Sequence, residues 1–158
     1  MYGEGAMIEH RTGNILASGA TRIVIPVNCY GAAGKGLALA AAQEWPGWAT
    51  SYRGSCRARM LRPGDVDMHY AACTGAPPVS FATKDHWRAP SRIEWIAQGL
   101  PVLAEIVRQT GPESIAIPAL GCGLGGLAWD DVRPLVLAAA ETMSAAGVNV
   151  WIYEPPAK

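Results

Sequence analysis

Residues 23–36 read IVIPVNCYGAAGKG, and residues 115–126 read IAIPALGCGLGG. Each segment begins with β-branched residues typical of a buried strand and continues into a loop that is nearly free of side chains. Backbone N–H groups in such a loop can approach a ligand closely, and at the start of a helix they form an anion site. Ligands bind at the carboxyl ends of the strands in open α/β sheets. Two such loops on neighbouring strands therefore predict a site for a diphosphate.

The length and composition predict one folded domain. We expect residues 7–158 to form it, and residues 1–6 to be a flexible end or a remnant of cloning. Half of the residues are hydrophobic and 16% are charged, which excludes the disordered class. The formal net charge is zero, which argues against a protein that binds nucleic acid mainly through phosphate contacts but leaves room for a local patch. Without an apolar run long enough for a membrane span or a secretion signal, we expect a cytoplasmic protein with no membrane contact.

The cysteines and histidines do not form a metal-binding pattern. Cys29, Cys56, Cys73 and Cys122 show no C-x-x-C spacing, and the three histidines are equally dispersed. A zinc site is not expected, and no other cofactor is required. We expect reduced cysteines, with Cys29 and Cys122 as small apolar fillers of the two glycine loops, because no base lies near them in sequence.

Strand patterns alternate with helical patterns along the chain. We expect strands over residues 7–11, 22–28, 66–72, 79–83, 114–118 and 148–153, and helices over 37–44, 48–59, 93–107 and 130–146. Ser91 followed by Glu94 predicts a capped start of the third helix, and Pro101 predicts a kink within it. The predicted fold class is α/β, a three-layer α/β/α sandwich around a mixed six-stranded sheet with residues 22–28 and 114–118 at its centre.

Residues 81–88, which read FATKDHWR, gather polar side chains and an indole at a strand end. Lys84 is either a solvated charge or, near apolar groups, an acid, base or amine nucleophile. His86, Trp87 and Arg88 have the chemistry to stack on a base and contact a phosphate. The alternative for Trp87 is packing over the following helix.

Two asparagines and one lysine allow more than one interpretation. Asn28, at the end of a predicted strand, either donates to a ribose hydroxyl or caps a turn. Asn14 either caps a short helical turn or accepts a hydrogen bond from an adenine amino group. Residues 34–36 (GKG) precede a helix but lack the P-loop pattern, so alone they indicate a glycine turn with a solvated lysine.

Together these motifs resemble a macrodomain, an ADP-ribose-binding fold, over nearly the whole chain. The matching segments are residues 13–16 (GNIL), 27–29 (VNC), 34–38 (GKGLA), 81–88 (FATKDHWR) and 118–127 (PALGCGLGGL). The Lys-x-His-Trp-Arg string and the Gly-Gly-Leu after the second loop resemble the DarG branch of macrodomains. Members of that branch are antitoxins that remove ADP-ribose attached to thymidine in single-stranded DNA by the toxin DarT.

The resemblance implies a role for each candidate site residue. Adenine would contact Asn14 and Ile15, and the distal ribose would contact Asn28, Gly34, Lys35 and Gly36. The diphosphate would lie on the backbone amides of Gly121, Cys122, Gly123, Leu124 and Gly125. Lys84 would be the catalytic residue, and the DNA would contact His86, Trp87, Arg88 and Arg92. The implied partners are ADP-ribose, ADP-ribosylated single-stranded DNA and a DarT-like toxin.

The resemblance also has limits that keep other functions open. A related branch, which cleaves ADP-ribose from protein carboxylates, pairs its lysine with an aspartate at the position of Gly125. We therefore expect hydrolysis of an N-glycosidic bond to a DNA base, with a non-catalytic ADP-ribose reader and a protein ADP-ribosyl esterase as alternatives. DarG carries a further C-terminal domain, whereas this chain stops at Lys158, as an excised domain or a standalone member would.

Overall fold

The computed structural model describes residues 6–156, so the prediction for residues 1–6 lies, except for Ala6, outside the described residues. Its elements in chain order are β1 (Ile8–Arg11), the 3₁₀ turn η1 (Ile15–Ala17), β2 (Arg22–Asn28), α1 (Gly36–Glu44), α2 (Pro46–Arg57), β3 (Val66–Asp67), α3 (His69–Thr74), β4 (Pro78–Lys84), α4 (Ile93–Thr110), β5 (Ser114–Ile117), α5 (Trp129–Ala145) and β6 (Asn149–Tyr153).

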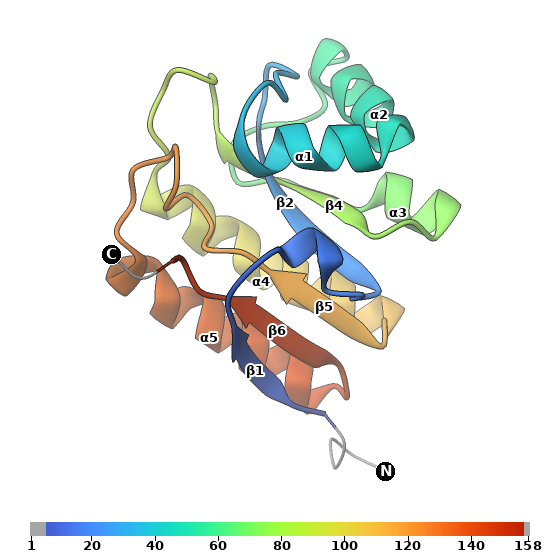
Figure 1. Ribbon diagram of the computed structural model, residues 1–158, viewed down its shortest axis with the longest axis vertical. Helices are drawn as coiled ribbons and strands as arrows, with labels where there is room; N and C mark the ends of the chain where they lie inside the picture. Colours follow the sequence, from blue (N-terminus) through green and yellow to red (C-terminus); the bar gives the residue numbers. More distant parts are fainter. Residues whose placement is uncertain (1–5, 157–158) are drawn as a thin grey trace.

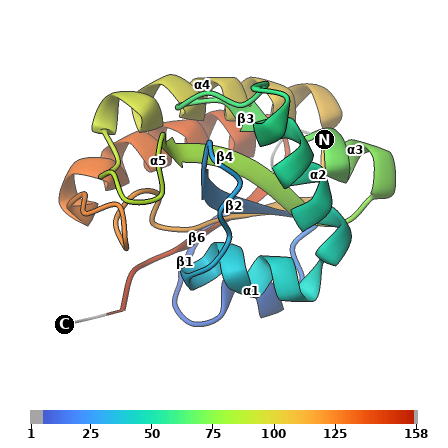
Figure 2. The ribbon, with the colours of Figure 1, turned by 90° about the horizontal axis from the view of Figure 1, so that it is seen from above.

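The strands form one mixed sheet in the order β1-β6-β5-β2-β4-β3, in which β3 alone runs antiparallel to its neighbour. Helices α4 and α5 cover one face, and α1 and α2 cover the other (Figures 1 and 2). The predicted three-layer sandwich with β2 and β5 at its centre is confirmed. Because β1, β6, β5, β2 and β4 run parallel, their carboxyl ends meet at one edge of the sheet.

Alternate residues of β2 enter two different cores. Val24 packs with α4 and α5, whereas Ile23 and Ile25 pack with α1 and α2. On the second side Trp48 donates its indole N–H to Ser80 Oγ at 3.0 Å. A strand that is buried on both faces explains the continuous apolar run at residues 23–27.

The strand predicted over residues 66–72 is wrong beyond Asp67. The backbone N–H of His69 donates to Asp67 Oδ1 at 2.9 Å, which starts helix α3. Met68 and Ala71, three positions apart, both enter the core under α4, as a helix allows. Gly75 ends the helix in the left-handed conformation at φ 77°.

The predicted cap of α4 is also wrong. Its N-cap is Arg92, which makes no side-chain capping bond, while Ser91 is buried against residues 121–125. The helix continues through Pro101 and ends at Thr110. Within residues 6–156, none of the helices combines the length and apolarity needed to cross a membrane.

Gly99 permits close packing of α4 on the sheet. An added β-carbon would lie 2.4 Å from Phe81 Cζ and 2.7 Å from the Gly64 carbonyl oxygen. We expect Gly99→Ala to lower the free energy of unfolding by about 1–3 kcal/mol through overpacking, although alanine is the better helix former. Urea unfolding measures the change.

The matched control for this prediction is Gly54→Ala in α2. A β-carbon there meets no atom within 4 Å, so the variant should gain up to about 1 kcal/mol from helix propensity alone. A Gly99→Ala protein as stable as the Gly54→Ala protein would contradict the close approach of α4 to β4.

Candidate functional site

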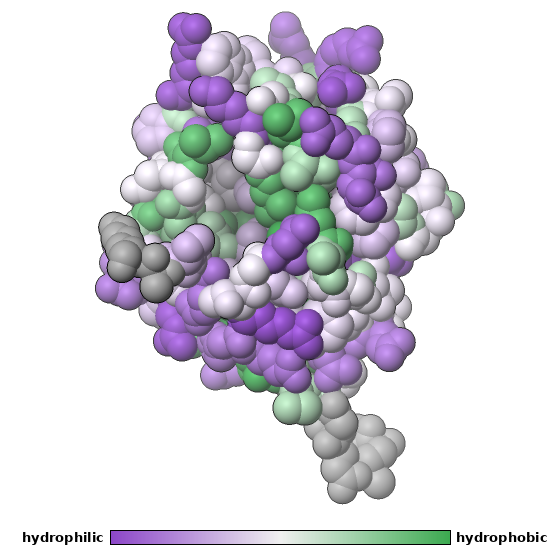
Figure 3. Space-filling view, in the orientation of Figure 1, coloured by the Kyte–Doolittle hydropathy of each residue, from purple (hydrophilic) through white to green (hydrophobic). Residues whose placement is uncertain are grey.

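Three loops meet at the carboxyl edge of the sheet. They follow β2 (residues 29–35), β4 (85–92) and β5 (118–128), and Figure 1 shows them on the same side of the molecule. The surface is hollowed between them, with apolar side chains in and around the hollow (Figure 3). This is the region where the sequence predicts a ligand.

The first loop ends at a helix start with unpaired donors. Lys35 is the N-cap of α1 and makes no side-chain capping bond, and the first helical N–H with a partner is that of Leu39, which donates to the Lys35 carbonyl at 3.2 Å. In the described part of the chain, the N–H groups of Gly36, Leu37 and Ala38 have no protein acceptor. They carry the partial positive charge of the helix terminus and favour an anion.

The second loop presents another set of donors. Its internal backbone hydrogen bonds join Cys122 N–H to the Ala119 carbonyl, Gly126 N–H to the Gly123 carbonyl and Leu127 N–H to the Gly121 carbonyl, at 3.1, 3.2 and 2.9 Å. Between residues 6 and 156, no protein acceptor faces the N–H groups of the three consecutive residues 123–125. The Leu124 Cδ1 atom lies 3.7 Å from where a β-carbon on Gly36 would be, so the second loop contacts the start of α1, where the first set of donors lies. Paired amide clusters of this kind suit a diphosphate.

The second loop leaves no space for a side chain at Gly125. A β-carbon there would lie 2.3 Å from Ser91 Oγ and 2.5 Å from the Gly121 carbonyl oxygen. The Ser91 N–H also donates to the Gly125 carbonyl at 3.0 Å, which fixes the loop against the start of α4. This geometry excludes an aspartate at position 125. Gly123, in contrast, is exposed and its β-carbon position is open.

Asn28 is buried and holds the first loop in shape. Its Nδ2 donates to the Ala32 carbonyl at 2.8 Å, and its Oδ1 accepts from the N–H of Tyr30 at 2.9 Å and the hydroxyl of Tyr52 at 3.0 Å. The turn-capping interpretation is therefore observed. A ribose contact by the remaining amide hydrogen stays a prediction.

Asn14 and Ile15 form the start of η1. The Oδ1 of Asn14 accepts from the N–H of Leu16 at 3.0 Å, so the asparagine caps this turn as one of its two interpretations predicted. Ile15 is buried in the core beside β2, and Asn14 is exposed. Their predicted contact with adenine stays a prediction.

Lys84 ends β4 at an irregularity in the sheet. Its register partner is Asn28, and the register shifts between Val27 and Asn28. The side chain is half-exposed, and its Nζ lies 3.4 Å from the Trp87 carbonyl oxygen. Since Cys29 N–H donates to the Asp85 carbonyl at 2.9 Å, the Lys84 segment is joined directly to the first glycine loop.

The residues after Lys84 form an exposed stack. The rings of His86 and Trp87 are stacked with centroids 5.1 Å apart, and the Arg88 guanidinium lies 4.4 Å from the Trp87 ring centre. Trp87 is 47% exposed, which fits a binding surface better than packing over α4. Arg92 does not join this stack, because its guanidinium lies over Trp95, at 5.7 Å.

Sequence reasoning missed Tyr30 as a member of this surface. Its ring meets His86 edge-on with centroids 4.6 Å apart, and it is 64% exposed. The two residues are far apart in sequence, and only the pairing of β2 with β4 brings them together. An aromatic residue inside a glycine loop was the available signal.

Cys29 and Cys122 are partly buried against the two cores, as small apolar fillers of the glycine loops would be. Burial, with a contribution from the Asp85 carboxylate, raises the pKa of Cys29 to about 12, and burial raises the pKa of Cys122 to about 11. Both thiols are protonated at neutral pH and are poor nucleophiles. Residues 6–156 contain no group of three or more His, Cys, Asp or Glu side chains placed to hold a metal ion.

The raised pKa values predict a pattern of thiol reactivity. At pH 7.5 iodoacetamide should modify the exposed Cys73 first, and should modify Cys29 and Cys122 more slowly by at least about a hundredfold, because their thiolate fractions are small. Peptide mass spectrometry over time measures the rates. In urea all these cysteines should react at similar rates. Rapid labelling of Cys29 in the folded protein would contradict the raised pKa of its thiol.

Comparison with known proteins gives one family model and several relatives. The family model "Macro domain" matches residues 24–136. A curated relative from Mycobacterium tuberculosis, named DNA ADP-ribosyl glycohydrolase, is 34% identical over 151 residues, which cover 94% of this chain and 42% of the relative. The chain thus spans about two fifths of the length of the curated relatives that it matches.

Solved structures agree with this result. The macrodomain of Mycobacterium tuberculosis DarG matches with a TM-score of 0.85 and 34% identity, covering 97% of this chain and all of the other. The structure of Thermosipho africanus DarTG in complex with ADP-ribose matches with a TM-score of 0.80 and 30% identity, covering 92% of this chain and 41% of the other.

Proposed function

This chain belongs to the macrodomain family, and on that premise we propose that it removes ADP-ribose from a modified base, thymidine, in single-stranded DNA. The observation that carries the proposal is the position of Lys84 at the edge where the second loop, with its unpaired N–H groups, contacts the start of α1. The identity to proteins named DNA ADP-ribosyl glycohydrolase supports the choice of substrate.

The diphosphate would bind between the start of α1 and residues 123–125. Both sites offer backbone N–H groups without a protein acceptor in the described chain, and hydrogen bonds from them to charged phosphate oxygens are stronger than those between neutral groups. Asn14 and Ile15 would contact adenine, and the distal ribose would lie against Asn28 and residues 34–36. Once the diphosphate is held, the ribose carbon attached to the base is fixed in position.

The reaction breaks the bond between that ribose carbon and a nitrogen of the base. Water supplies a hydroxyl group to the carbon and a proton to the departing nitrogen, so the products are ADP-ribose and the restored base. Positive charge develops on the ribose as the base leaves. The protein contributes the orientation of the sugar and a proton donor at the base.

Lys84 would act in one of two ways. As an acid, its ammonium group protonates the departing base and recovers its proton from the attacking water. As a nucleophile, its neutral amine attacks the ribose carbon of the opened sugar, the bond from that carbon to the base nitrogen breaks, and the base leaves with a proton. Water then hydrolyses the resulting imine, which releases ADP-ribose and restores the amine. Both roles need an amine at the end of β4 and neither needs a carboxylate at position 125, which the packing of Ser91 excludes.

The remaining parts of the proposal concern partners and location. His86, Trp87, Arg88 and Arg92 would contact the strand that carries the modified base. The relatives include a fused DNA ADP-ribosyl transferase and glycohydrolase, so we propose a DarT-like enzyme as the source of the modification, in the cytoplasm where the DNA lies.

Lys84→Ala should abolish release of ADP-ribose from thymidine-modified single-stranded DNA and leave the affinity for ADP-ribose within a few-fold. The variant removes the proposed acid or nucleophile but no diphosphate contact. Lys84→Arg should also fail, because a guanidinium stays protonated and cannot serve as an amine nucleophile or a readily cycling acid. Chromatography of the products and calorimetry with ADP-ribose measure the two effects.

Borohydride during turnover separates the two roles of Lys84. An amine nucleophile gives a reducible adduct on Lys84, whereas an acid gives none. Near-normal turnover by Lys84→Ala would overturn the mechanism. If the intact protein binds ADP-ribose but releases it from no modified DNA or protein, the result would instead support the alternative of a non-catalytic ADP-ribose reader.

Gly123→Glu should lose ADP-ribose binding while the protein stays folded. A β-carbon at residue 123 meets no protein atom within 4 Å, so the fold tolerates it, but the carboxylate would occupy the proposed diphosphate position and repel its charge. Calorimetry measures binding, and thermal unfolding gives the control. Unchanged affinity in a folded variant would place the diphosphate elsewhere.

A further inference from the structure

Helix α2 carries an unbalanced positive charge in a chain whose net charge is zero. Residues 46–62 contain four arginines and no aspartate or glutamate. We call these residues the arginine edge: Arg53, Arg57, Arg59 and Arg62. All four are exposed, and none forms an ion pair with a carboxylate of the described chain. The proposed mechanism assigns no role to these four arginines.

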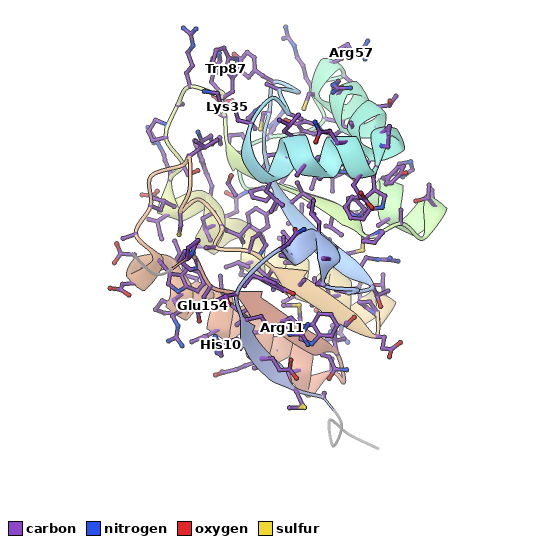
Figure 4. All side chains as sticks on the ribbon, in the orientation of Figure 1. His10, Arg11, Lys35, Arg57, Trp87 and Glu154 are labelled. Atoms are coloured by element: carbon purple, nitrogen blue, oxygen red, sulfur yellow. The ribbon has the colours of Figure 1, made fainter. Side chains whose placement is uncertain are left out.

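The arginine edge reaches the exposed aromatic stack through Arg53. A β-carbon on Gly31 would lie 3.6 Å from the Cα and the Cγ of Arg53, so the loop that carries Tyr30 lies directly against α2. Arg57 follows Arg53 by one helical turn. From Tyr30 the stack continues through His86 to Trp87, with ring centroids 4.6 and 5.1 Å apart. Figure 4 shows Arg57, Lys35 and Trp87 at the same end of the molecule.

Arg59 adds an independent observation. It is the one non-glycine residue of the described chain with a positive φ, at 56°. This left-handed position after the end of α2 favours glycine, and an arginine there costs stability. Arg59 therefore presents its charge from a position where a glycine would be more stable.

We propose that Tyr30 and the arginine edge bind the single-stranded DNA that extends from the modified base. The aromatic rings stack on unpaired bases, and the guanidinium groups contact the phosphates. The first turn of α5 carries the exposed Asp130 and Asp131, whose negative charge directs the phosphates of the strand towards the arginines of α2. This inference rests on the proposed function only for the position of the modified base.

Binding of an unmodified oligonucleotide tests the surface without reference to catalysis. Fluorescence anisotropy with a labelled single strand of about 12 nucleotides is measured over a range of salt concentrations. Arg53→Ala combined with Arg57→Ala should weaken binding by about tenfold at low salt and reduce the slope of log K against log salt by about 1.4. Tyr30→Ala should weaken binding by about fivefold with little change in that slope.

Two further variants separate a binding role from a structural one. Arg59→Gly should keep or raise the unfolding temperature while the salt slope falls by about 0.7, a combination that a merely structural residue cannot give. The charge-matched control is Arg108→Ala on α4, whose guanidinium pairs with Glu105 on the surface. It should leave both the affinity and the slope unchanged.

The result that supports the surface is loss of oligonucleotide binding with ADP-ribose affinity preserved. Unchanged slopes, an equal loss in Arg108→Ala, or a duplex bound as tightly as the single strand would overturn it. If the intact protein releases ADP-ribose from no modified DNA but these variants still lose single-strand binding, the proposed reaction fails and the surface stands.

Discussion

The proposed ADP-ribose site depends on the glycines of residues 121–126, because their lack of side chains allows this loop to pack closely against the start of α4. Leu127 and Ser91 fill the space that a β-carbon on Gly121 would occupy, Ser91 and the Gly121 carbonyl fill that of Gly125, and the Ser91 N–H donates to the Gly125 carbonyl. With the loop fixed from below by packing, the N–H groups of residues 123–125 are left without protein acceptors in the described chain. The contacts with Ser91 therefore anchor the loop, so the N–H groups of residues 123–125 are not needed to hold its shape. They remain free to bind the anion in the proposed site.

The same packing constrains the chemistry. A loop that admits no side chain at position 125 cannot supply a carboxylate partner for Lys84 in the proposed reaction. The start of the segment that carries Lys84 is held at two points, because Lys84 pairs in register with Asn28 and the Asp85 carbonyl accepts from the Cys29 N–H. A flexible amine on a fixed backbone is suited to reach a sugar whose position is set by its diphosphate.

Much of this arrangement can be predicted from the sequence, and the failures have physical causes. Residues 22–28 form a continuous apolar run, and the residues from Ile93 onward repeat at helical spacing. Both patterns are strong enough to predict the strand and the helix that the structure has. Residues 66–72 fail because a short run of mixed apolar residues does not distinguish a strand from a short helix, and the Asp67 hydrogen bond to the His69 N–H starts a helix there. Tyr30 and Arg53 join the site only through strand pairing and helix packing, and the one local signal in the sequence is an aromatic residue inside a glycine loop.

In the proposed function, the neutral net charge limits binding to unmodified DNA, and the arginine edge contacts the strand beside the modified base. A protein with little long-range attraction for DNA is not held by the large excess of unmodified strands. Once the ADP-ribose is bound between the loops, the neighbouring nucleotides are tethered beside Tyr30 and α2 at a high effective concentration, where weak contacts suffice. Selection of the modified strand then comes from the diphosphate and ribose contacts, and the arginines set the direction of the strand more than its affinity.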